Sequence, residues 1–190
     1  PPIVPKPGLL NHLTVAAFNE FWFRKAPVER VEELQTISSF FHPLDMVGAW
    51  NRLYGSRGML QYQFVVPFGA EETMRTVIER LAASGAASFL AVLKRCGDGN
   101  AAPISFPAPG WSLALDVPAA SKGIGDLLHG LDRLVLDAGG RHYFAKDSHT
   151  TPDVVRAGYP RLDEWKSIRR SVDPHGMWQS DLSRRLGLTD

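Results

Sequence analysis

Two glutamines on one predicted strand are the first residues of this chain whose type and spacing suit a ligand. Over residues 60–66, Gln61 and Gln63 alternate with apolar residues, and this alternation places both amides on one face of a sheet. Each amide offers N–H donors and an acceptor oxygen, a set that suits a polyhydroxylated, sugar-like ligand. The alternative is an ordinary antiparallel sheet with one solvated face, which needs no ligand.

Polar side chains from three other predicted strands can reach the same face. Lys94 lies on one of these strands, Ser112 and Asp116 alternate with apolar residues on the next, and Lys146 ends the last. A lysine close to an aspartate in a partly enclosed site has a pKa that its surroundings can shift, as proton transfer requires. A solvated face with an incidental ion pair explains the same pattern, and the sequence alone leaves both interpretations open.

The elements that would position these residues predict an α+β fold. Helical periodicity favours amphipathic helices over 70–84 and 123–138, and the segments expected to be strands are 31–41, 60–66, 88–95, 111–117 and 141–146. This order of strands and helices favours an antiparallel sheet with helices packed on one face. The opposite face would then be free to hold a ligand.

The segments on either side of the sheet are expected to be helical. An aromatic-rich segment over 11–25 precedes the sheet, and a mainly helical, basic segment follows it from Thr151 onward. The expected buried anchors of this last segment are Trp165, Ile168 and Trp178.

Composition excludes several classes of protein. The 190 residues suffice for one sizeable core, and a formal net charge of +1 gives no sign of a nucleic-acid groove. Cys96 is the one cysteine, so neither an internal disulfide framework nor a cysteine-based zinc cluster can form, and the histidines lack metal-ligand spacing. No apolar run is long enough to span a bilayer. We therefore expect a metal-free protein that is cytoplasmic or peripherally associated with the cell envelope.

A series of short motifs identifies a resemblance. The sequences FHPLDM at 41–46, WNRLYG at 50–55 and LQYQFVVP at 60–67 resemble the decaprenylphosphoryl-β-D-ribose 2′-oxidase family, the flavin subunit of an actinobacterial arabinose-donor epimerase. The similarity continues in the same order through PISFP at 103–107, PGW at 109–111, GGR at 139–141, AKDS at 145–148, YPR at 159–161, DEW at 163–165 and VDP at 172–174. This order, kept over nearly the whole chain, is too specific for a chance match.

The resemblance implies part of an FAD-linked oxidoreductase of the vanillyl-alcohol-oxidase type, with a role in cell-wall arabinan synthesis. Residues 1–139 would form most of a substrate-binding cap domain, and residues 140–190 a segment that completes a flavin-binding domain. The N-terminal part of that flavin domain would be missing, which fits the proline-rich start and makes this portion inactive alone. The implied reaction oxidises a secondary hydroxyl of a polyprenyl-phosphoryl sugar to a keto sugar, with hydride transfer to flavin N5.

The same resemblance implies roles for individual residues. Lys146 would be the catalytic residue and, with Tyr143, would contact the FAD. The residues expected to bind the substrate are Gln61, Gln63, Lys94, Asp116, Asn51 and Arg52, the last two in a loop that could form a lid. The implied partners are a sugar-phosphate or lipid-linked sugar substrate, the FAD domain of the same parent chain and a partner reductase, but no nucleic acid.

Two alternatives to this function stay open. One is a non-catalytic module of the same fold that binds a sugar or a phosphate, and the other is a related FAD-linked aldonolactone or alditol oxidase. A pure binding module would have no use for a flavin-domain segment, so the intact AKDS motif at 145–148 favours an oxidase.

The chain departs from the family at one position with a testable consequence. The family's cysteine that nitroaromatic inhibitors modify falls at Ala114, and the neighbouring asparagine falls at Ser112. Because alanine has no thiol, we expect the full-length enzyme to resist covalent inhibition but not non-covalent inhibition. Mass spectrometry after incubation with a nitroaromatic inhibitor checks this, and a stoichiometric adduct at residue 114 would contradict it.

Overall fold

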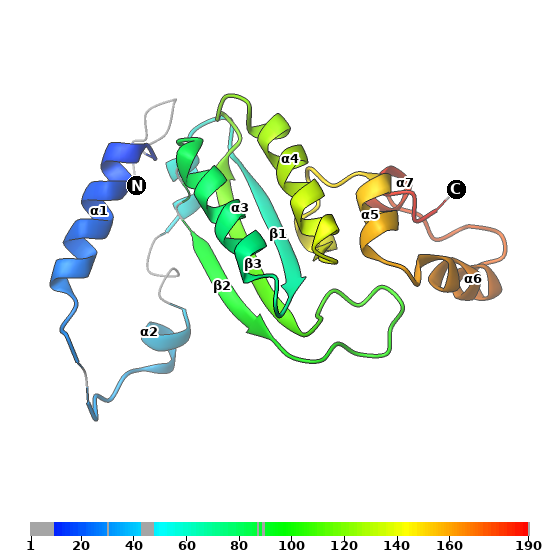
Figure 1. Cartoon of the computed structure of the whole chain (residues 1–190), viewed down its shortest axis with the longest axis horizontal. Helices are drawn as coiled ribbons and strands as arrows, with labels where there is room; N and C mark the ends of the chain where they lie inside the picture. The colour runs from blue at the N-terminus through cyan, green and yellow to red at the C-terminus, as the bar shows by residue number, and fades with distance from the viewer. Residues whose placement is uncertain (1–9, 30, 43–47, 87, 89, 190) are drawn as a thin grey trace.

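The computed structural model describes residues 10–29, 31–42, 48–86, 88 and 90–189 (Figure 1). The proline-rich start and most of the FHPLDM motif lie outside these residues. In chain order the elements are α1 (His12–Lys25), α2 (Ile37–Phe41), the 3-10 helix η1 (Trp50–Tyr54), β1 (Met59–Pro67), α3 (Glu71–Ala83), β2 (Ala91–Cys96), β3 (Gly110–Pro118), α4 (Ile124–Asp137), β4 (Arg141–His142), the 3-10 helix η2 (Phe144–Lys146), α5 (Pro152–Gly158), α6 (Leu162–Val172) and α7 (Asp181–Arg185).

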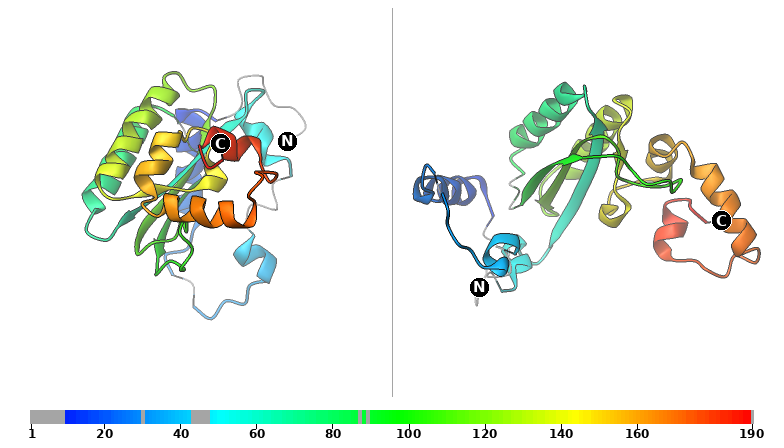
Figure 2. Two further views of the ribbon diagram at one scale, coloured as in Figure 1. Left: turned by 90° about the vertical axis from the view of Figure 1, so that its right-hand side faces the viewer. Right: turned by 90° about the horizontal axis from the view of Figure 1, so that it is seen from below.

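A four-stranded sheet is the centre of the described fold. Its strand order is β2-β3-β1-β4, and every neighbouring pair is antiparallel. Helices α3 and α4 lie on one face of the sheet, and α5, α6 and α7 lie together beyond one end of it (Figures 1 and 2). The predicted α+β fold, with helices on one face of an antiparallel sheet and a helical C-terminal segment, is confirmed.

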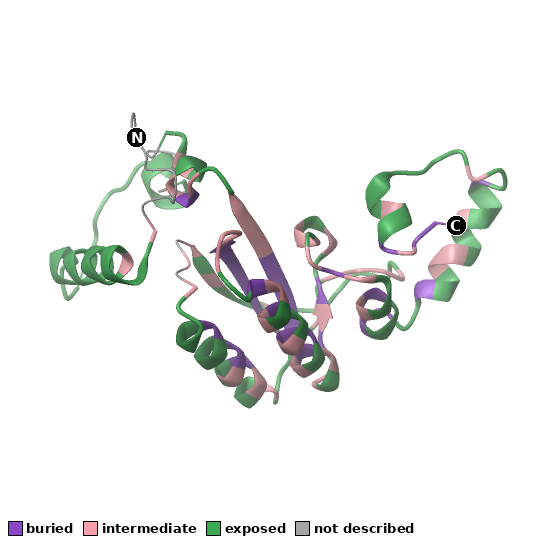
Figure 3. Ribbon diagram, turned by 90° about the horizontal axis from the view of Figure 1, so that it is seen from above, coloured by how far each residue is buried: buried purple, intermediate pink, exposed green. Residues whose placement is uncertain are grey.

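The layer between the sheet and helices α3 and α4 is the main hydrophobic core. Alternate residues of β1 and β3 point into it, as the period of two in their sequences predicts, and the apolar stripes of the helices pack on them. Its buried members are Tyr62, Phe64, Val66, Met74, Val77, Leu81, Leu113, Leu115, Val117, Ile124, Leu128, Leu131 and Val135. Each large apolar side chain contributes roughly 1.5–3 kcal/mol by leaving water, so this packing decides which face of the sheet stays uncovered (Figure 3).

A second, smaller core holds the C-terminal helices together. Its buried residues, with Trp165 half-buried against them, are Val155, Tyr159, Leu162, Leu186 and Leu188. Two of the expected anchors are wrong, since Ile168 is 51% and Trp178 is 72% exposed. The helical period explains why Ile168 is exposed, because α6 turns Arg169 inward instead. Arg169 Nη2 lies 2.9 Å from Asp173 Oδ2. The two cores lie on either side of residue 140, and the domain boundary there stays a prediction.

The predicted strand over 31–41 is wrong. Residues 31–36 form neither helix nor strand, and the helix α2 follows them. Thr36 caps this helix, because its hydroxyl accepts a hydrogen bond from the N–H of Ser39 (3.2 Å). In the sheet, β3 and β4 already occupy both edges of β1, so β1 has no edge left for another strand.

The predicted strand over 141–146 is wrong beyond its first two residues. The pairing of β4 with β1 ends at His142, although the N–H of Tyr143 still donates to Gln63 O (3.0 Å). The chain then turns into η2, where the N–H of Lys146 donates to Tyr143 O (3.0 Å). Lys146 therefore reaches the sheet from a turn, not from a strand.

Helix α1 lies apart from both cores. A capping box between Asn11 and Thr14 begins the helix, and Ala26 before Pro27 ends it. No residue of α1 is buried, and its aromatic side chains, with Phe23 at 78%, are exposed (Figure 3). None of the described helices combines the length and the apolar character needed to cross a membrane.

Gly110 provides a test of how closely β1 and β3 must approach. It pairs with Pro67, and a Cβ at this position would lie 2.0 Å from Val66 O. Because the clash is with backbone, we expect Gly110→Ala to force the strands apart and to lower the free energy of unfolding by about 2–4 kcal/mol. Chemical denaturation measures this change.

The matched control is Gly125→Ala in α4, where an added Cβ meets nothing within 4 Å. Alanine favours a helix more than glycine does, so this variant should be as stable as the wild type or up to about 1 kcal/mol more stable. If Gly110→Ala behaved like Gly125→Ala, the close approach of β1 and β3 would not be a constraint on the fold.

Candidate functional site

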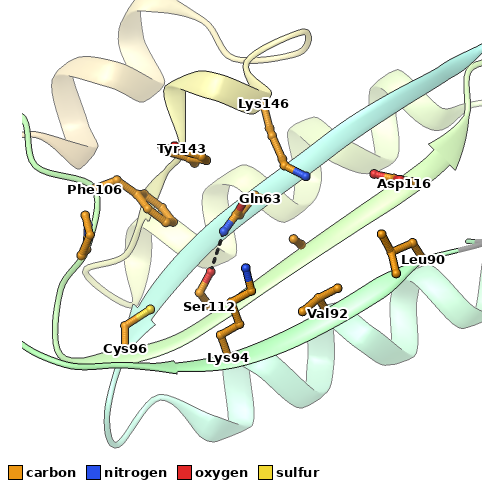
Figure 4. Close-up of a pocket in the computed structure, with 12 residues that line it drawn as sticks. Gln63, Leu90, Val92, Lys94, Cys96, Phe106, Ser112, Asp116, Tyr143 and Lys146 are labelled. Carbon is orange, nitrogen blue, oxygen red and sulfur yellow. Dashed lines mark hydrogen bonds between the residues drawn. The ribbon is translucent and has the colours of Figure 1, made fainter. Parts of the chain in front are cut away.

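A hollow of about 540 Å³ lies on the face of the sheet that the helices leave uncovered. Side chains of β1, β2 and β3 form its floor, and side chains of the β2–β3 loop and of the segment around η2 form its rim (Figure 4). The polar residues that line it are Gln63, Lys94, Ser112, Asp116 and Lys146, together with Tyr143.

Two hydrogen-bonded pairs cross from β1 to β3 on this face. Gln61 stands directly opposite Asp116, and its Nε2 donates to Asp116 Oδ1 (2.9 Å). Gln63 Nε2 donates to Ser112 Oγ, its diagonal neighbour (3.1 Å). Gln63, Ser112 and Asp116 are only 7%, 1% and 1% exposed. These three side chains are therefore not solvated in the way that the simpler interpretation of the sequence requires, although Lys94 on the neighbouring strand β2 is exposed.

One carboxylate oxygen of Asp116 lacks a hydrogen-bond donor among the described residues. Its Oδ2 is buried and accepts no hydrogen bond from any residue that the structure describes. A buried polar atom in this state costs about 1–3 kcal/mol, so such an atom calls for an explanation. Because Asp116 lines the hollow, a hydroxyl of a bound ligand could donate a hydrogen bond to this oxygen.

Two lysines bring positive charge to the hollow from different elements. Lys94 comes from β2, where it pairs with Ser112 of β3, and Lys146 comes from η2. The ammonium groups of both point towards the middle of the hollow (Figure 4). Asp116 is the one acidic residue in the described lining, so the lining carries a net positive charge, which favours an anionic ligand.

Aromatic side chains close one end of the hollow. Phe106 from the β2–β3 loop packs against Tyr143, with ring centroids 4.6 Å apart. This pair lies at the opposite end from Asp116 (Figure 4). The hollow therefore has a polar end and an apolar end, an arrangement that can orient a ligand whose two ends differ in polarity.

The structure brings most of the predicted site residues together. Those that line the hollow are Gln63, Lys94, Asp116, Tyr143 and Lys146. Gln61 is next to them through its hydrogen bond with Asp116. Asn51 and Arg52 do not line the hollow and lie exposed in η1. The roles of all these residues stay predictions.

A buried polar cluster on the other face of β1 was not expected from the sequence. The Tyr62 hydroxyl donates to Asp132 Oδ1 (2.9 Å), and His142 Nε2 lies 3.0 Å from each of these two atoms. His149 Nε2 lies 3.6 Å from Asp132 Oδ2. The one signal in the sequence was Tyr62, because the hydroxyl of a tyrosine on the apolar face of a strand needs a partner.

Burial is the main cause of the shifted pKa values of Tyr62 and His149 in this cluster. Burial, reinforced by the charge of Asp132 and its hydrogen bond, raises the pKa of Tyr62 well above its ordinary value, so the hydroxyl stays protonated. Burial lowers the pKa of His149, although Asp132 opposes this, and the nearby His129 and His142 lower it further. Among the described residues, no group of three or more histidine, cysteine, aspartate or glutamate side chains is arranged to hold a metal ion.

Comparison with known proteins confirms the resemblance that the motifs indicate. The family model for D-arabinono-1,4-lactone oxidase matches residues 119–186. Decaprenylphosphoryl-beta-D-ribose oxidase of Mycolicibacterium smegmatis is 50% identical over 188 residues, which are 99% of this chain and 40% of that protein. An uncharacterised protein encoded in the mprA 5′ region of Streptomyces coelicolor is 37% identical over 197 residues, covering 99% of this chain and 53% of that protein. The chain thus spans about half, or less, of the length of these relatives.

The lowered pKa of His149 predicts how stability depends on pH. Between the ordinary value of 6.5 and the lower value in the folded protein, the unfolded chain binds a proton that the folded chain does not. This group therefore contributes its full stability above about pH 6.5, and that contribution is lost as the pH falls through the folded pKa. Chemical denaturation of the wild type and of His149→Gln over this range measures the contribution as their difference.

We expect the loss of stability on acidification to be smaller in His149→Gln than in the wild type. His12→Gln, at an exposed position of α1, is the control and should follow the wild type. Parallel curves for the wild type and His149→Gln would show that His149 does not change its proton affinity on folding.

Proposed function

From its likeness to a decaprenylphosphoryl-β-D-ribose oxidase, we propose that this chain is the substrate-binding part of an FAD-linked oxidase that acts on a sugar hydroxyl. The proposed substrate is a polyprenyl-phosphoryl sugar, whose secondary hydroxyl becomes a ketone. The observation that carries this proposal is the hollow, where amide, hydroxyl and carboxylate groups lie between two lysines.

The charge of the hollow supports a phosphorylated substrate. Lys94 and Lys146 face a single carboxylate in the described lining, Asp116, and an ammonium is a compact point charge that suits a phosphate. The apolar end formed by Phe106 and Tyr143 suits the part of the ligand that is not a sugar. The two ends together match a molecule that joins a polar sugar phosphate to an apolar chain.

The residues at the rim fit the edge of a flavin ring, but not its diphosphate. Tyr143 and Lys146 offer an aromatic ring and an ammonium at the rim of the hollow. Gly97 and Gly99, the glycine pair most like a phosphate loop, precede no helix whose N-terminus could hold a diphosphate. We therefore assign only the contacts with the ring to this chain. When bound, the flavin supplies the acceptor for the hydride.

Several residues of the chain can then bind and orient the substrate together. Gln63 Nε2 is engaged by Ser112, which fixes the amide so that its Oε1 can accept from a sugar hydroxyl. Asp116 Oδ2 can accept from a second hydroxyl, while Gln61 holds the same carboxylate through Oδ1. Lys94 holds the phosphate, and Lys146 contacts the reacting hydroxyl. Fixed groups of this kind contribute by orienting the substrate before any bond breaks.

The match of residues 119–186 to D-arabinono-1,4-lactone oxidase favours a second candidate, oxidation of a small aldonolactone or alditol. The matched region includes Tyr143 and Lys146 but neither Gln63 nor Lys94, so it covers the rim of the hollow and not the floor. A neutral lactone would make no use of the net positive charge. A non-catalytic sugar- or phosphate-binding module remains the third alternative, and it predicts binding without oxidation.

The full-length protein distinguishes these functions. Its flavin absorbance, its oxidation of a polyprenyl-phosphoryl ribose and its oxidation of an aldonolactone are measured side by side, with mass spectrometry to identify the keto product. We expect a yellow protein with a much higher kcat/KM for the phosphorylated sugar. A colourless protein would contradict the oxidase, and a preference for the lactone would favour the second candidate.

The two lysines should differ in their effects on catalysis. We expect Lys146→Met to lower kcat by about 100-fold, because it removes a charged contact with the reacting hydroxyl. We expect Lys94→Met to raise KM by about 10-fold for the phosphorylated substrate, with little change in kcat. Steady-state kinetics of the full-length enzyme measures both. Lys122→Met, at an exposed position outside the hollow, is the control and should match the wild type.

A further inference from the structure

We propose that Arg141 is a positioning residue that sets the apolar wall of the hollow. It would do so by holding the β2–β3 loop, residues 97–109, against the segment that carries Tyr143 and Lys146. Arg141 does not line the hollow, so it acts through the loop. This inference rests on the proposed function in one respect: the wall belongs to a substrate site only if that function is correct.

The guanidinium of Arg141 is itself held in place. Its Nη1 donates to Ser105 O (3.1 Å), and its centre lies 5.5 Å from the centroid of the Tyr159 ring. Tyr159 is 1% exposed, and its hydroxyl donates to His142 O (2.5 Å), which fixes the ring beneath the guanidinium. A charged donor makes a stronger hydrogen bond than a neutral one, and a guanidinium stacked on a ring loses little freedom on making it.

The loop is also tied to the C-terminal segment by Ile104, which packs half-buried against the smaller core. The loop has few other ties to that segment. It contains no helix or strand, and its two ends lie close together, because a Cβ on Gly99 would lie 2.4 Å from Pro107 O. Arg161 Nη1 donates to Ala101 O (3.0 Å), but Arg161 is half exposed and pairs with Glu164. An exposed interaction of this kind contributes little, so the half-buried bond from Arg141 is the stronger of these two hydrogen bonds.

The bond from Arg141 falls beside the residue that forms the wall. Ser105 is the direct neighbour of Phe106, whose ring packs against Tyr143 with centroids 4.6 Å apart. Fixing the carbonyl of Ser105 therefore fixes where the Phe106 ring can lie. Without Arg141, Phe106 can leave Tyr143, and the apolar end of the hollow opens to water. Binding of the apolar part of a ligand would weaken, whereas Lys146 would stay in place.

Kinetics of the full-length holoenzyme tests this role. We expect Arg141→Met to raise KM for the lipid-linked substrate by about 10-fold while kcat stays within about 3-fold of the wild type. Phe106→Ala should have the same effect, and the double variant should be no worse than Phe106→Ala alone, because both changes remove the same wall. Arg141→Lys should recover part of the loss. Arg156→Met, at an exposed position of α5, is the control.

Hydrogen exchange on the 190-residue chain gives a readout that does not depend on activity. We expect Arg141→Met to speed exchange at amides of the loop around Phe106 by about 10-fold and to leave amides of β1 and α4 unchanged. Unchanged exchange in the loop, or additive effects of Arg141→Met and Phe106→Ala on KM, would overturn the role of Arg141. A full-length protein that oxidises no sugar would instead contradict the proposed function, and the exchange result would still decide the role of Arg141.

Discussion

The antiparallel pairing of β1 with β3 is the constraint on which the rest of the structure depends. Its register sets Gln61 opposite Asp116, and by the same alternation it turns Tyr62 and Phe64 towards the helices. A slip of one residue would send the core residues to the hollow and the amides to the core. The core therefore stabilises the site, because helices α3 and α4 can pack well in one register only.

Alternation along strands predicts much of the site, because the period of two leaves little choice once one face is covered. Lys94, Asp116 and Gln63 meet for this reason. The same reasoning fails where no strand exists. Lys146 lies in a 3-10 turn. Phe106 is positioned through its neighbour Ser105, whose carbonyl accepts a hydrogen bond from Arg141, 36 residues further along the chain. The direction of a side chain in an irregular loop depends on such distant contacts, so local sequence patterns cannot predict it.

The two buried aspartates, Asp116 and Asp132, differ in the charge of the residues around them. Asp132 lies on the helix side, where Tyr62 and His142 both lie within hydrogen-bond distance of one of its carboxylate oxygens. That cluster joins α4, β1 and β4, but Asp132 Oδ2, His142 Nδ1 and His149 Nε2 are buried without a hydrogen-bond partner among the described residues. Asp132 also lines a second hollow, of about 430 Å³. Asp116 also has one oxygen bonded, by Gln61, but its other oxygen faces a hollow large enough for a ligand. Both carboxylates are therefore buried beside a hollow, each with one oxygen that accepts no hydrogen bond from the part of the chain that the structure describes. The described lining around Asp116 has two lysines, whereas that around Asp132 has one arginine and a second carboxylate, Asp126, so the charge of the lining distinguishes the two hollows.

The hollow exists only where the sheet meets the segment after residue 140. The floor comes from β1, β2 and β3, whereas Tyr143 and Lys146 at the rim come from that segment. The chain just after Lys146 is fixed by Arg185, whose guanidinium pairs with the Asp147 carboxylate and donates to Thr150 O (3.0 Å). Arg185 lies in α7, so the packing of the C-terminal helices reaches Lys146 through these contacts. The position of that ammonium over the sheet is therefore a property of both cores together, and a change in either core can alter the site without touching a residue that lines it.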